Sequence, residues 1–477
     1  MRPFDESGAF RPFTSTHGLR RLALRGAGVT IFSQSLGFVI QMIATVILAR
    51  LLTPADFGLL AMVTTFSLLL MNCGLNGFTE TVLNRQEIDH ALVSNLFWVN
   101  LGLGILLTIG FAVAGSLMVW FYGEPQVQIV TGPIALSILF TSLSVMHLAL
   151  LKRAMWFSMI SAIEIIARIV SVTVSILLAL DGWSYWALVA GFVSLPLTIC
   201  VGSWFACRWV PRLPVRADGT GSAVRFAVHT YGRFAANYLT RNLDNLLIGW
   251  RFGALSLGFY KKAYDLFVLP ASQISSPLTV VAVSALSRLA ADRDQYKRHL
   301  LRALTTLAFV GMALAAILTL VGADLIFLLL GPGWEESGRI FRFFGPGIGM
   351  MLLNGTHGWI HLSIGRADRW LRWGVFEISV TTLLFLLGLP WGGVGIAVAW
   401  TVSFWLLTIP SLWYAGRPIQ FGVAPAIGAI WKYVLASAAA GMLVALITQR
   451  VPFWDLLPGA LAAISRIGIT SLLFLTL

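Results

Sequence analysis

Apolar runs long enough to cross a membrane recur along the whole 477-residue chain and constrain its fold more than any other feature. A helix needs about 20 apolar residues to cross the hydrocarbon core of a bilayer. Breaking the runs at clusters of glycine, proline and charge gives fourteen candidate spans. Only 11% of the residues are charged, against about 25% in a soluble domain. We therefore predict an all-α integral membrane protein, and exclude a secreted, cytosolic or disordered chain.

Basic residues outside the spans fall almost entirely on one set of alternate connections. The other set holds only Arg50, Arg251 and Arg450. Because cytoplasmic connections carry the excess of Lys and Arg, this asymmetry predicts a cytoplasmic N-terminus. An even number of spans then places the C-terminus in the cytoplasm as well. The net charge of +13 reflects this orientation and contact with anionic lipids, and does not indicate binding to nucleic acid.

An internal repeat indicates two related halves. Residues 47–60 read ILARLLTPADFGLL and residues 247–260 read LIGWRFGALSLGFY, which aligns Gly58 with Gly258. A second echo aligns Glu164 with Glu377. Repeated halves with a site between them are common in transporters, so we predict two pseudo-symmetric six-helix bundles and two further helices. The predicted division is a cytoplasmic tail over 1–25, bundles over 26–206 and 226–414, a cytoplasmic linker over 207–225, and helices 13 and 14 over 425–477.

Several motifs resemble those of a known family. They are ILARLLTPADFGLLAM at 47–62, VSNLFWVN at 93–100, WFYGEP at 120–125, LLKRAMWF at 150–157, RNLDNLLIGWRFGALSLGFYKKAYDLFVLPASQIS at 241–275, ALSRL at 285–289 and LLLGPGW at 328–334. On these motifs the chain resembles the polysaccharide transporter family of the MOP flippase superfamily, in its WzxC-like branch of Wzx-type oligosaccharide flippases. The similarity covers nearly the full chain.

This resemblance implies a fold like that of the MATE transporters and a location in the bacterial inner membrane. It implies that the protein moves an undecaprenyl-diphosphate-linked oligosaccharide, a repeat unit of exopolysaccharide, O-antigen or capsule, from the cytoplasmic to the periplasmic leaflet. It also implies a central cavity bounded mainly by the first, second, seventh and eighth spans. A short cytoplasmic tail is expected beyond the last span.

The span over 226–250 is the most polar of the fourteen. Four polar residues recur every four positions and share one helix face: His229, Arg233, Asn237 and Arg241. Two more polar residues, Asp244 and Asn245, follow directly after them. A polar stripe on a membrane helix must line a cavity or pair with a neighbour. Arg binds phosphate through its planar fork, so the stripe predicts a cationic cavity wall for a diphosphate. A structural seam, such as Arg241 with Asp244, is the alternative.

The neighbouring spans carry further polar residues. Lys261 and Lys262 open the span over 257–285 and predict a second cationic patch, although Lys261 can instead pair with Asp265 four residues later. The first two spans carry neutral stripes that fit sugar hydroxyls and helix packing about equally well. These stripes include Gln34, Gln41, Asn72 and Asn76.

Four carboxylates are candidates for coupling transport to an ion. They are Asp244, Glu377, Glu164 and Asp265. Asp244 lies three residues from Arg241 and can exchange this partner with a diphosphate. Glu164 has Arg168 at i+4, whereas Glu377 has Thr381 there. A carboxylate without a cation can carry a proton; the alternative is a hydrogen bond from Glu377 to a neighbouring helix.

The chain carries no motif for nucleotide hydrolysis, a cofactor or a metal ion. A P-loop is absent from the sequence, Cys73, Cys200 and Cys207 form no CxxC pair, and His357 and His361 lack a third ligand. A glycan polymerase or glycosyltransferase is the alternative class, but such enzymes need larger outer loops. A cation-coupled multidrug exporter would have an acidic or apolar cavity. We therefore predict a transporter and no enzyme, whose partners are the lipid-linked oligosaccharide, membrane lipids and other polysaccharide assembly proteins.

Overall fold

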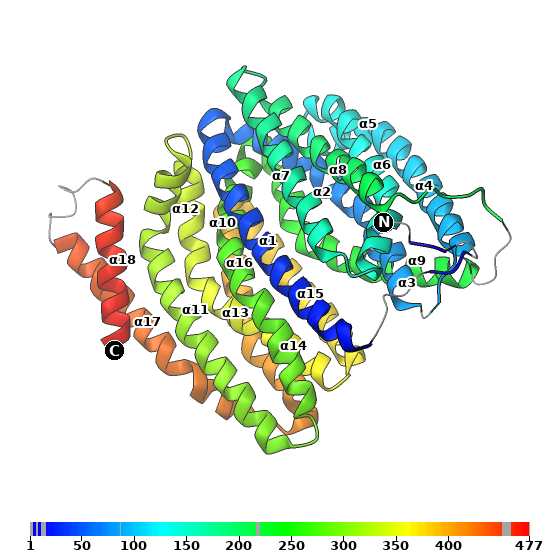
Figure 1. The fold of residues 1–477 in the computed structure, drawn as a ribbon. Helices are drawn as coiled ribbons and strands as arrows, with labels where there is room; N and C mark the ends of the chain where they lie inside the picture. Colours follow the sequence, from blue (N-terminus) through cyan, green and yellow to red (C-terminus); the bar gives the residue numbers. More distant parts are fainter. Residues whose placement is uncertain are drawn as a thin grey trace. The chain divides into compact units, whose positions relative to one another are not determined.

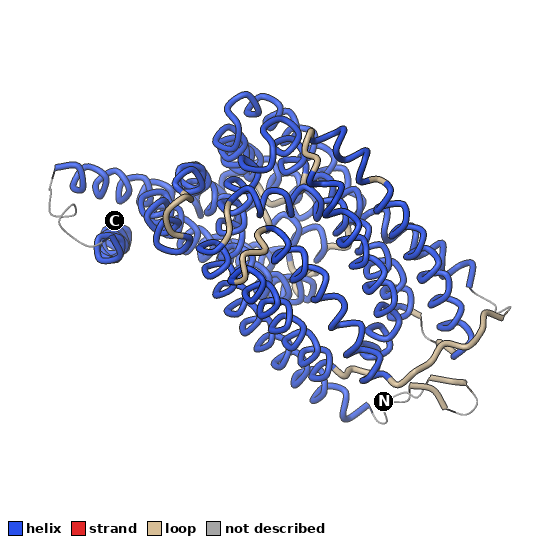
Figure 2. Tube along the Cα trace, turned by 90° about the horizontal axis from the view of Figure 1, so that it is seen from above, coloured by secondary structure: helices blue, strands red, loops and turns tan. Residues whose placement is uncertain are grey.

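A computed structural model describes residues 3–5, 8–10, 16–85, 87–215, 220–450 and 459–476 of the chain. Helices joined by short loops make up nearly all of this part (Figures 1 and 2). Within the same residues, β pairing is limited to two isolated bridges, Phe4 with Phe10 and Ala9 with Asp89. The predicted all-α class is confirmed.

The chain forms two compact units, Met1–Gly258 (unit 1) and Phe259–Leu477 (unit 2). The helices of unit 1 are α1 (Thr16–Leu51), α2 (Pro54–Cys73), η1 (Gly74–Phe78), α3 (Thr79–Asn84), α4 (His90–Val113), α5 (Gly115–Tyr122), α6 (Gln126–Arg153), α7 (Phe157–Leu180), α8 (Tyr185–Cys207) and α9 (Thr220–Arg241). α10 (Leu243–Arg288) begins in unit 1 and continues into unit 2. The division into 26–206 and 226–414, which follows the sequence repeat, stays a prediction.

The remaining helices belong to unit 2. They are α11 (Arg293–Leu330), α12 (Glu335–Phe344), η2 (Gly345–Gly347), α13 (Ile348–Asn354), α14 (Thr356–Ser363), α15 (Ala367–Gly388), η3 (Leu389–Trp391), α16 (Gly392–Gly416), η4 (Arg417–Ile419), α17 (Val423–Arg450) and α18 (Gly459–Thr476). α11 packs against α12, α13, α17 and α18, and α15 packs against α16. A salt bridge of 2.7 Å from Arg466 to Asp324 further ties α18 to α11.

In unit 1, α8 packs against α6 and α7, while α1 packs against α7 and α4 against α6. Local sequence explains the sharp start of α2. Thr53 and Asp56 form a capping box, and Pro54 occupies the first turn, where a missing N–H costs nothing. Ser184 before α8 donates a hydrogen bond to Asp56, which fixes this corner of the unit.

Ten helical segments of the described residues are long and apolar enough to cross a membrane. The protein is therefore a multi-pass membrane protein. The predicted number of fourteen spans is not confirmed, because some segments hold more than one predicted span and others are broken. Asp368–Ile419 joins α15 and α16, and Leu243–Arg288 contains a kink at Gly253. Gly253 has φ 77° and ψ −176°, a conformation open to glycine because it lacks a Cβ.

Two predicted spans are not continuous helices. The span over 226–250 is divided at Asn242, where α9 ends and α10 begins. The span over 337–363 is divided among α12, η2, α13 and α14, with Gly355 between the last two helices. Neither α9 nor α14 is among the ten apolar segments.

Candidate functional site

The polar helix α9 lies against the second helix of unit 1. It packs against α2, η1, α3 and α4. The Tyr231 hydroxyl donates a 3.0 Å hydrogen bond to the carbonyl oxygen of Leu69 on α2. A Cβ at Gly77 would lie 3.0 Å from the carbonyl oxygen of Ala227, so the two backbones approach closely there. The polar stripes predicted over 57–79 and 226–250 therefore belong to helices in direct contact.

The described part of the α9 stripe points outward. His229 and Arg241 are both exposed, so their polar ends are available to a ligand. The side chains of Arg233 and Asn237 lie outside the described residues, as does that of Asn76; only their place in α9 and η1 is described. The role of the stripe as a diphosphate site stays a prediction.

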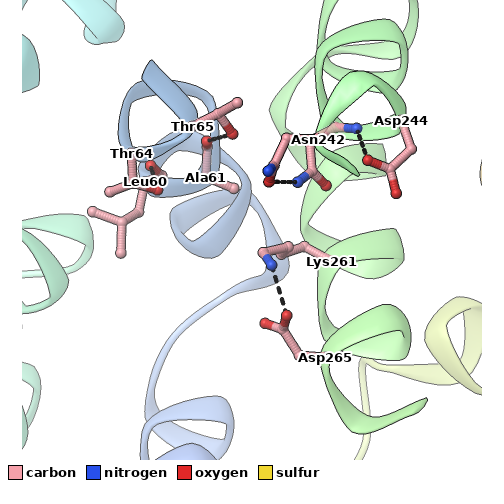
Figure 3. A network of polar contacts seen from close by, with 9 residues as sticks. Leu60, Ala61, Thr64, Thr65, Asn242, Asp244, Lys261 and Asp265 are labelled. Atoms are coloured by element: carbon pink, nitrogen blue, oxygen red, sulfur yellow. Dashed lines mark hydrogen bonds and ion pairs between the residues drawn. The ribbon is translucent and has the colours of Figure 1, made fainter. Parts of the chain in front are cut away.

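The turn between α9 and α10 buries a carboxylate and an amide (Figure 3). Asp244 is 0% exposed and Asn245 is 2% exposed. Asp244 accepts a 2.8 Å hydrogen bond from the backbone N–H of Asn245, and Asn242 donates one of 2.9 Å to the carbonyl oxygen of Tyr238. Within the described residues, the buried Oδ1 of Asn245 has no hydrogen-bond partner. Since a buried acceptor without a donor is costly, this oxygen is suited to accept a hydrogen bond from a ligand or water.

α2 contributes hydroxyls and an irregular turn to the same unit. Thr64 and Thr65 donate to the carbonyl oxygens of Leu60 and Ala61 on their own helix (Figure 3). Asn72 donates in the same way to Leu68. α2 then passes into η1, a π-helical turn, and such turns occur frequently at functional sites.

Gln34 and Gln41 on α1 are both exposed, which is compatible with either lining or packing roles. Glu164 and Arg168 on α7, to which α1 packs, are also exposed. The ion pair that their spacing predicts is not among those formed by the described residues. Arg168 instead lies against α1, where a Cβ at Gly37 would approach its Nε to 3.1 Å.

In unit 2, Lys261 forms a 2.6 Å ion pair with Asp265 on the next turn of α10 (Figure 3). This is the structural alternative that the spacing allowed. Lys262 is half-buried. Because the Lys261 ammonium is engaged by Asp265, this ion pair must open before Lys261 can bind a substrate.

Glu377 on α15 is held by a neighbouring segment. Asn354, the last residue of α13, donates a 2.8 Å hydrogen bond to Glu377 Oε1. His357 on α14 has Nε2 at 4.0 Å from Glu377 Oε2. No local spacing in the sequence could connect Asn354 or His357 to Glu377, since the contact depends on helix packing.

Within the described residues, no group of three or more His, Cys, Asp and Glu side chains is placed to hold a metal ion. His357 and His361 lie beside each other, with ring centroids 6.1 Å apart, and no third donor of this kind joins them there. Cys200 and Cys207 are free thiols buried in unit 1.

Comparison with known proteins gives consistent matches. A family described as "Polysaccharide biosynthesis protein" matches residues 47–339. The succinoglycan biosynthesis transport protein ExoT of Rhizobium meliloti is 22% identical over 378 residues, covering 79% of this chain and 76% of ExoT. The lipopolysaccharide biosynthesis protein WzxC of Escherichia coli is 22% identical over 399 residues, covering 82% of this chain and 79% of WzxC. Among solved structures, lipid II flippase MurJ in an inward closed conformation superposes with a TM-score of 0.76 and 14% identity, covering 95% of this chain and 97% of MurJ.

Proposed function

Because the chain belongs to the polysaccharide biosynthesis protein family matched by residues 47–339, we propose that it is a flippase for lipid-linked oligosaccharide. Its substrate is an oligosaccharide on undecaprenyl diphosphate, moved from the cytoplasmic to the periplasmic leaflet of the bacterial inner membrane. The names of two relatives, the succinoglycan biosynthesis transport protein ExoT and the lipopolysaccharide biosynthesis protein WzxC, support this class of cargo. The fold shared with MurJ supports the same type of movement.

The observation that carries the proposal is the polar helix α9 packed on α2, in a protein whose described residues include ten apolar segments long enough to cross a membrane. Arg241 ends this helix with an exposed guanidinium, four residues before the buried amide of Asn245. A guanidinium can donate two parallel hydrogen bonds to a diphosphate, and the exposed amides of Gln34 and Gln41 suit sugar hydroxyls. Within unit 1, Arg233 and Asn237 are proposed to bind the anionic head group together with Arg241, while Lys261 and Lys262 of unit 2 are proposed as a second cationic patch.

Vesicles containing the purified full-length chain test the proposal. The probe is undecaprenyl diphosphate carrying one fluorescently labelled hexose, and its arrival in the other leaflet is followed by an impermeant quencher. We expect Arg241→Ala to slow flipping about 10-fold or more, since a hydrogen bond to a charged group contributes about 1.5–3 kcal/mol. Arg241→Lys should recover part of the rate, because it keeps the charge and loses the fork.

Arg225→Ala is the matched control, because Arg225 is an exposed cation on the same helix, four turns before Arg241. It should flip at the wild-type rate. Vesicles that flip the probe no faster than protein-free vesicles would refute the function. A wild-type rate in Arg241→Ala would refute the site and leave the function standing.

Orientation and coupling belong to the same proposal. The distribution of Lys and Arg supports cytoplasmic N- and C-termini. Single cysteines placed in the N-terminal tail should therefore react with an impermeant reagent only after the membrane is opened.

Asp244 and Glu377 are the proposed coupling carboxylates, with Glu164 and Asp265 as the other candidates. Other polysaccharide assembly proteins are the proposed partners in the membrane.

A further inference from the structure

A buried histidine faces a carboxylate between α14 and α15 in unit 2. His357 is 7% exposed, and its Nδ1 lies within hydrogen-bond distance of the carbonyl oxygen of Asn354. A carbonyl oxygen can only accept, so Nδ1 carries the hydrogen. In the neutral ring, Nε2 is then an acceptor. This nitrogen lies 4.0 Å from Glu377 Oε2, so two acceptors face each other across the helix contact.

The hydrogen bond from Asn354 determines which oxygen of Glu377 faces the histidine. Asn354 Nδ2 donates to Glu377 Oε1 at 2.8 Å. The Oδ1 atom of Asn354 lies 3.2 Å from the hydroxyl of the fully buried Ser411 on α16, which also lies 2.7 Å from the carbonyl oxygen of Thr408. With the amide oriented in this way, Glu377 Oε1 is satisfied and Oε2 is the oxygen directed to His357.

We propose that His357 and Glu377 together bind one proton, which joins α14 to α15. The proton comes from water and resides between Nε2 and Oε2, so that the ring donates to the carboxylate. A charged hydrogen bond of this kind spans about 2.7–2.9 Å, so proton binding draws the two side chains together from 4.0 Å. Gly355 is the single residue between α13 and α14, and its backbone stays in the right-handed helical region.

Neighbouring charges favour protonation of this pair over protonation of His361, the buried histidine one turn later on α14. His361 on α14 is fully buried, and within the described residues neither of its ring nitrogens has a hydrogen-bond partner. Its ring lies 6.0 Å from that of Tyr414 on α16, over which the Arg369 guanidinium sits at 4.2 Å. A proton on His361 would therefore add a positive charge near an existing one.

The remaining charged or titratable groups on the surrounding helices are otherwise engaged or exposed. Tyr296 on α11 shares a 2.6 Å hydrogen bond with Ser363. Asp368 at the start of α15 is exposed and pairs with Arg366, and Arg372 on α15 is exposed. Within the described residues, none of these groups forms a hydrogen bond or an ion pair with the carboxylate of Glu377.

The proposal extends the role of Glu377 as a coupling carboxylate by adding His357 as its partner, but it concerns proton binding alone and does not depend on a transported substrate. It is tested by pH-difference infrared spectroscopy of the purified full-length chain in lipid. In the wild type, a carboxyl band and an imidazole band should change over the same pH interval. Glu377→Gln should remove the carboxyl band and displace the imidazole change, and His357→Gln should displace the carboxyl change.

Asp368→Asn is the matched control, since Asp368 is an exposed carboxylate at the start of the same helix α15. It should leave both signals of the pair unchanged. The proposal is overturned if the imidazole band is unchanged in Glu377→Gln and the carboxyl band is unchanged in His357→Gln. It is also overturned if Glu377→Gln removes no carboxyl band. Should Glu377→Gln fail to fold, His357→Gln alone decides, because a carboxyl change at the wild-type pH would exclude a shared proton. If this proton site is refuted, the proposed function still stands or falls by the separate assay of labelled-lipid flipping.

Discussion

Replacement of Gly58 by alanine perturbs a helix contact in unit 1 that leaves no room for a side chain. A Cβ at Gly58 on α2 would lie 1.7 Å from the carbonyl oxygen of Ala254 on α10. A Cβ at Gly258 would lie 1.8 Å from the carbonyl oxygen of Pro54. Each glycine thus faces the carbonyl one turn earlier on the other helix, and the contact is reciprocal.

The magnitude follows from these distances. A carbon and a carbonyl oxygen in contact are usually about 3.3–3.6 Å apart, so α2 and α10 must separate by more than 1 Å in Gly58→Ala. The clash is with backbone, which cannot rotate away as a side chain can. Overpacking typically costs about 1–3 kcal/mol, and we expect Gly58→Ala to reach the upper end of that range. Because both substitutions open the same crossing, the double variant should cost less than the sum of the single ones.

Thermal unfolding of the purified protein in detergent measures the effect. Gly102→Ala on α4 is the control, since a Cβ there meets nothing within 4 Å. It should be neutral or slightly stabilising, by up to about 1 kcal/mol of helix propensity. If Gly58→Ala unfolds at the same temperature as Gly102→Ala, or if the two single losses add fully in the double variant, the reasoning from close backbone contact is wrong.

Two further substitutions test local features at helix starts. Asp56→Ala removes the capping box of α2 and the acceptor of Ser184, and should cost about 1–2 kcal/mol in thermal unfolding, whereas Asp56→Asn should cost less. Asp292 caps α11, and the backbone N–H of Gln295 holds the pKa of its carboxyl below the usual value. The Asp292 carboxylate contributes to the free energy of unfolding above its unfolded-state pKa, and this contribution is lost as pH falls through its folded-state pKa. The stability difference between wild type and Asp292→Ala should therefore shrink on acidification. Asp292→Asn should show no such pH dependence.

The class of the fold followed from the length of the apolar runs, because lipid excludes unpaired backbone groups and leaves helices as the simplest solution. The repeat also identified a real packing feature, since the aligned residues Gly58 and Gly258 face each other. The break at Asn242 was not foreseen, because the four-residue spacing of the polar stripe continues across it. The signal was present: Asn242, Asp244 and Asn245 are residue types that hydrogen-bond backbone groups at helix ends.

The contacts of Glu377 illustrate a different limit. Its absence of a cation at i+4 was correctly noted from the sequence, yet its hydrogen bond comes from Asn354 on another helix. Spacing rules describe neighbours on one helix and carry no information on which face meets a second helix. The Glu164 and Arg168 spacing was misleading for the related reason that both side chains are exposed and Arg168 packs on α1.

Two helix breaks in the described part of the chain lie beside buried polar residues. A break exposes backbone groups that lipid cannot satisfy, so it is tolerated only where protein or a watery space surrounds it. Discontinuous helices serve as binding sites in transporters for this reason. Buried Asp244 and Asn245 lie at the α9–α10 break, and buried His357 lies at the α13–α14 break beside Glu377. Glu164 aligns with Glu377 in sequence but is exposed on the unbroken helix α7, so the surroundings of the two carboxylates differ although the residue type is the same.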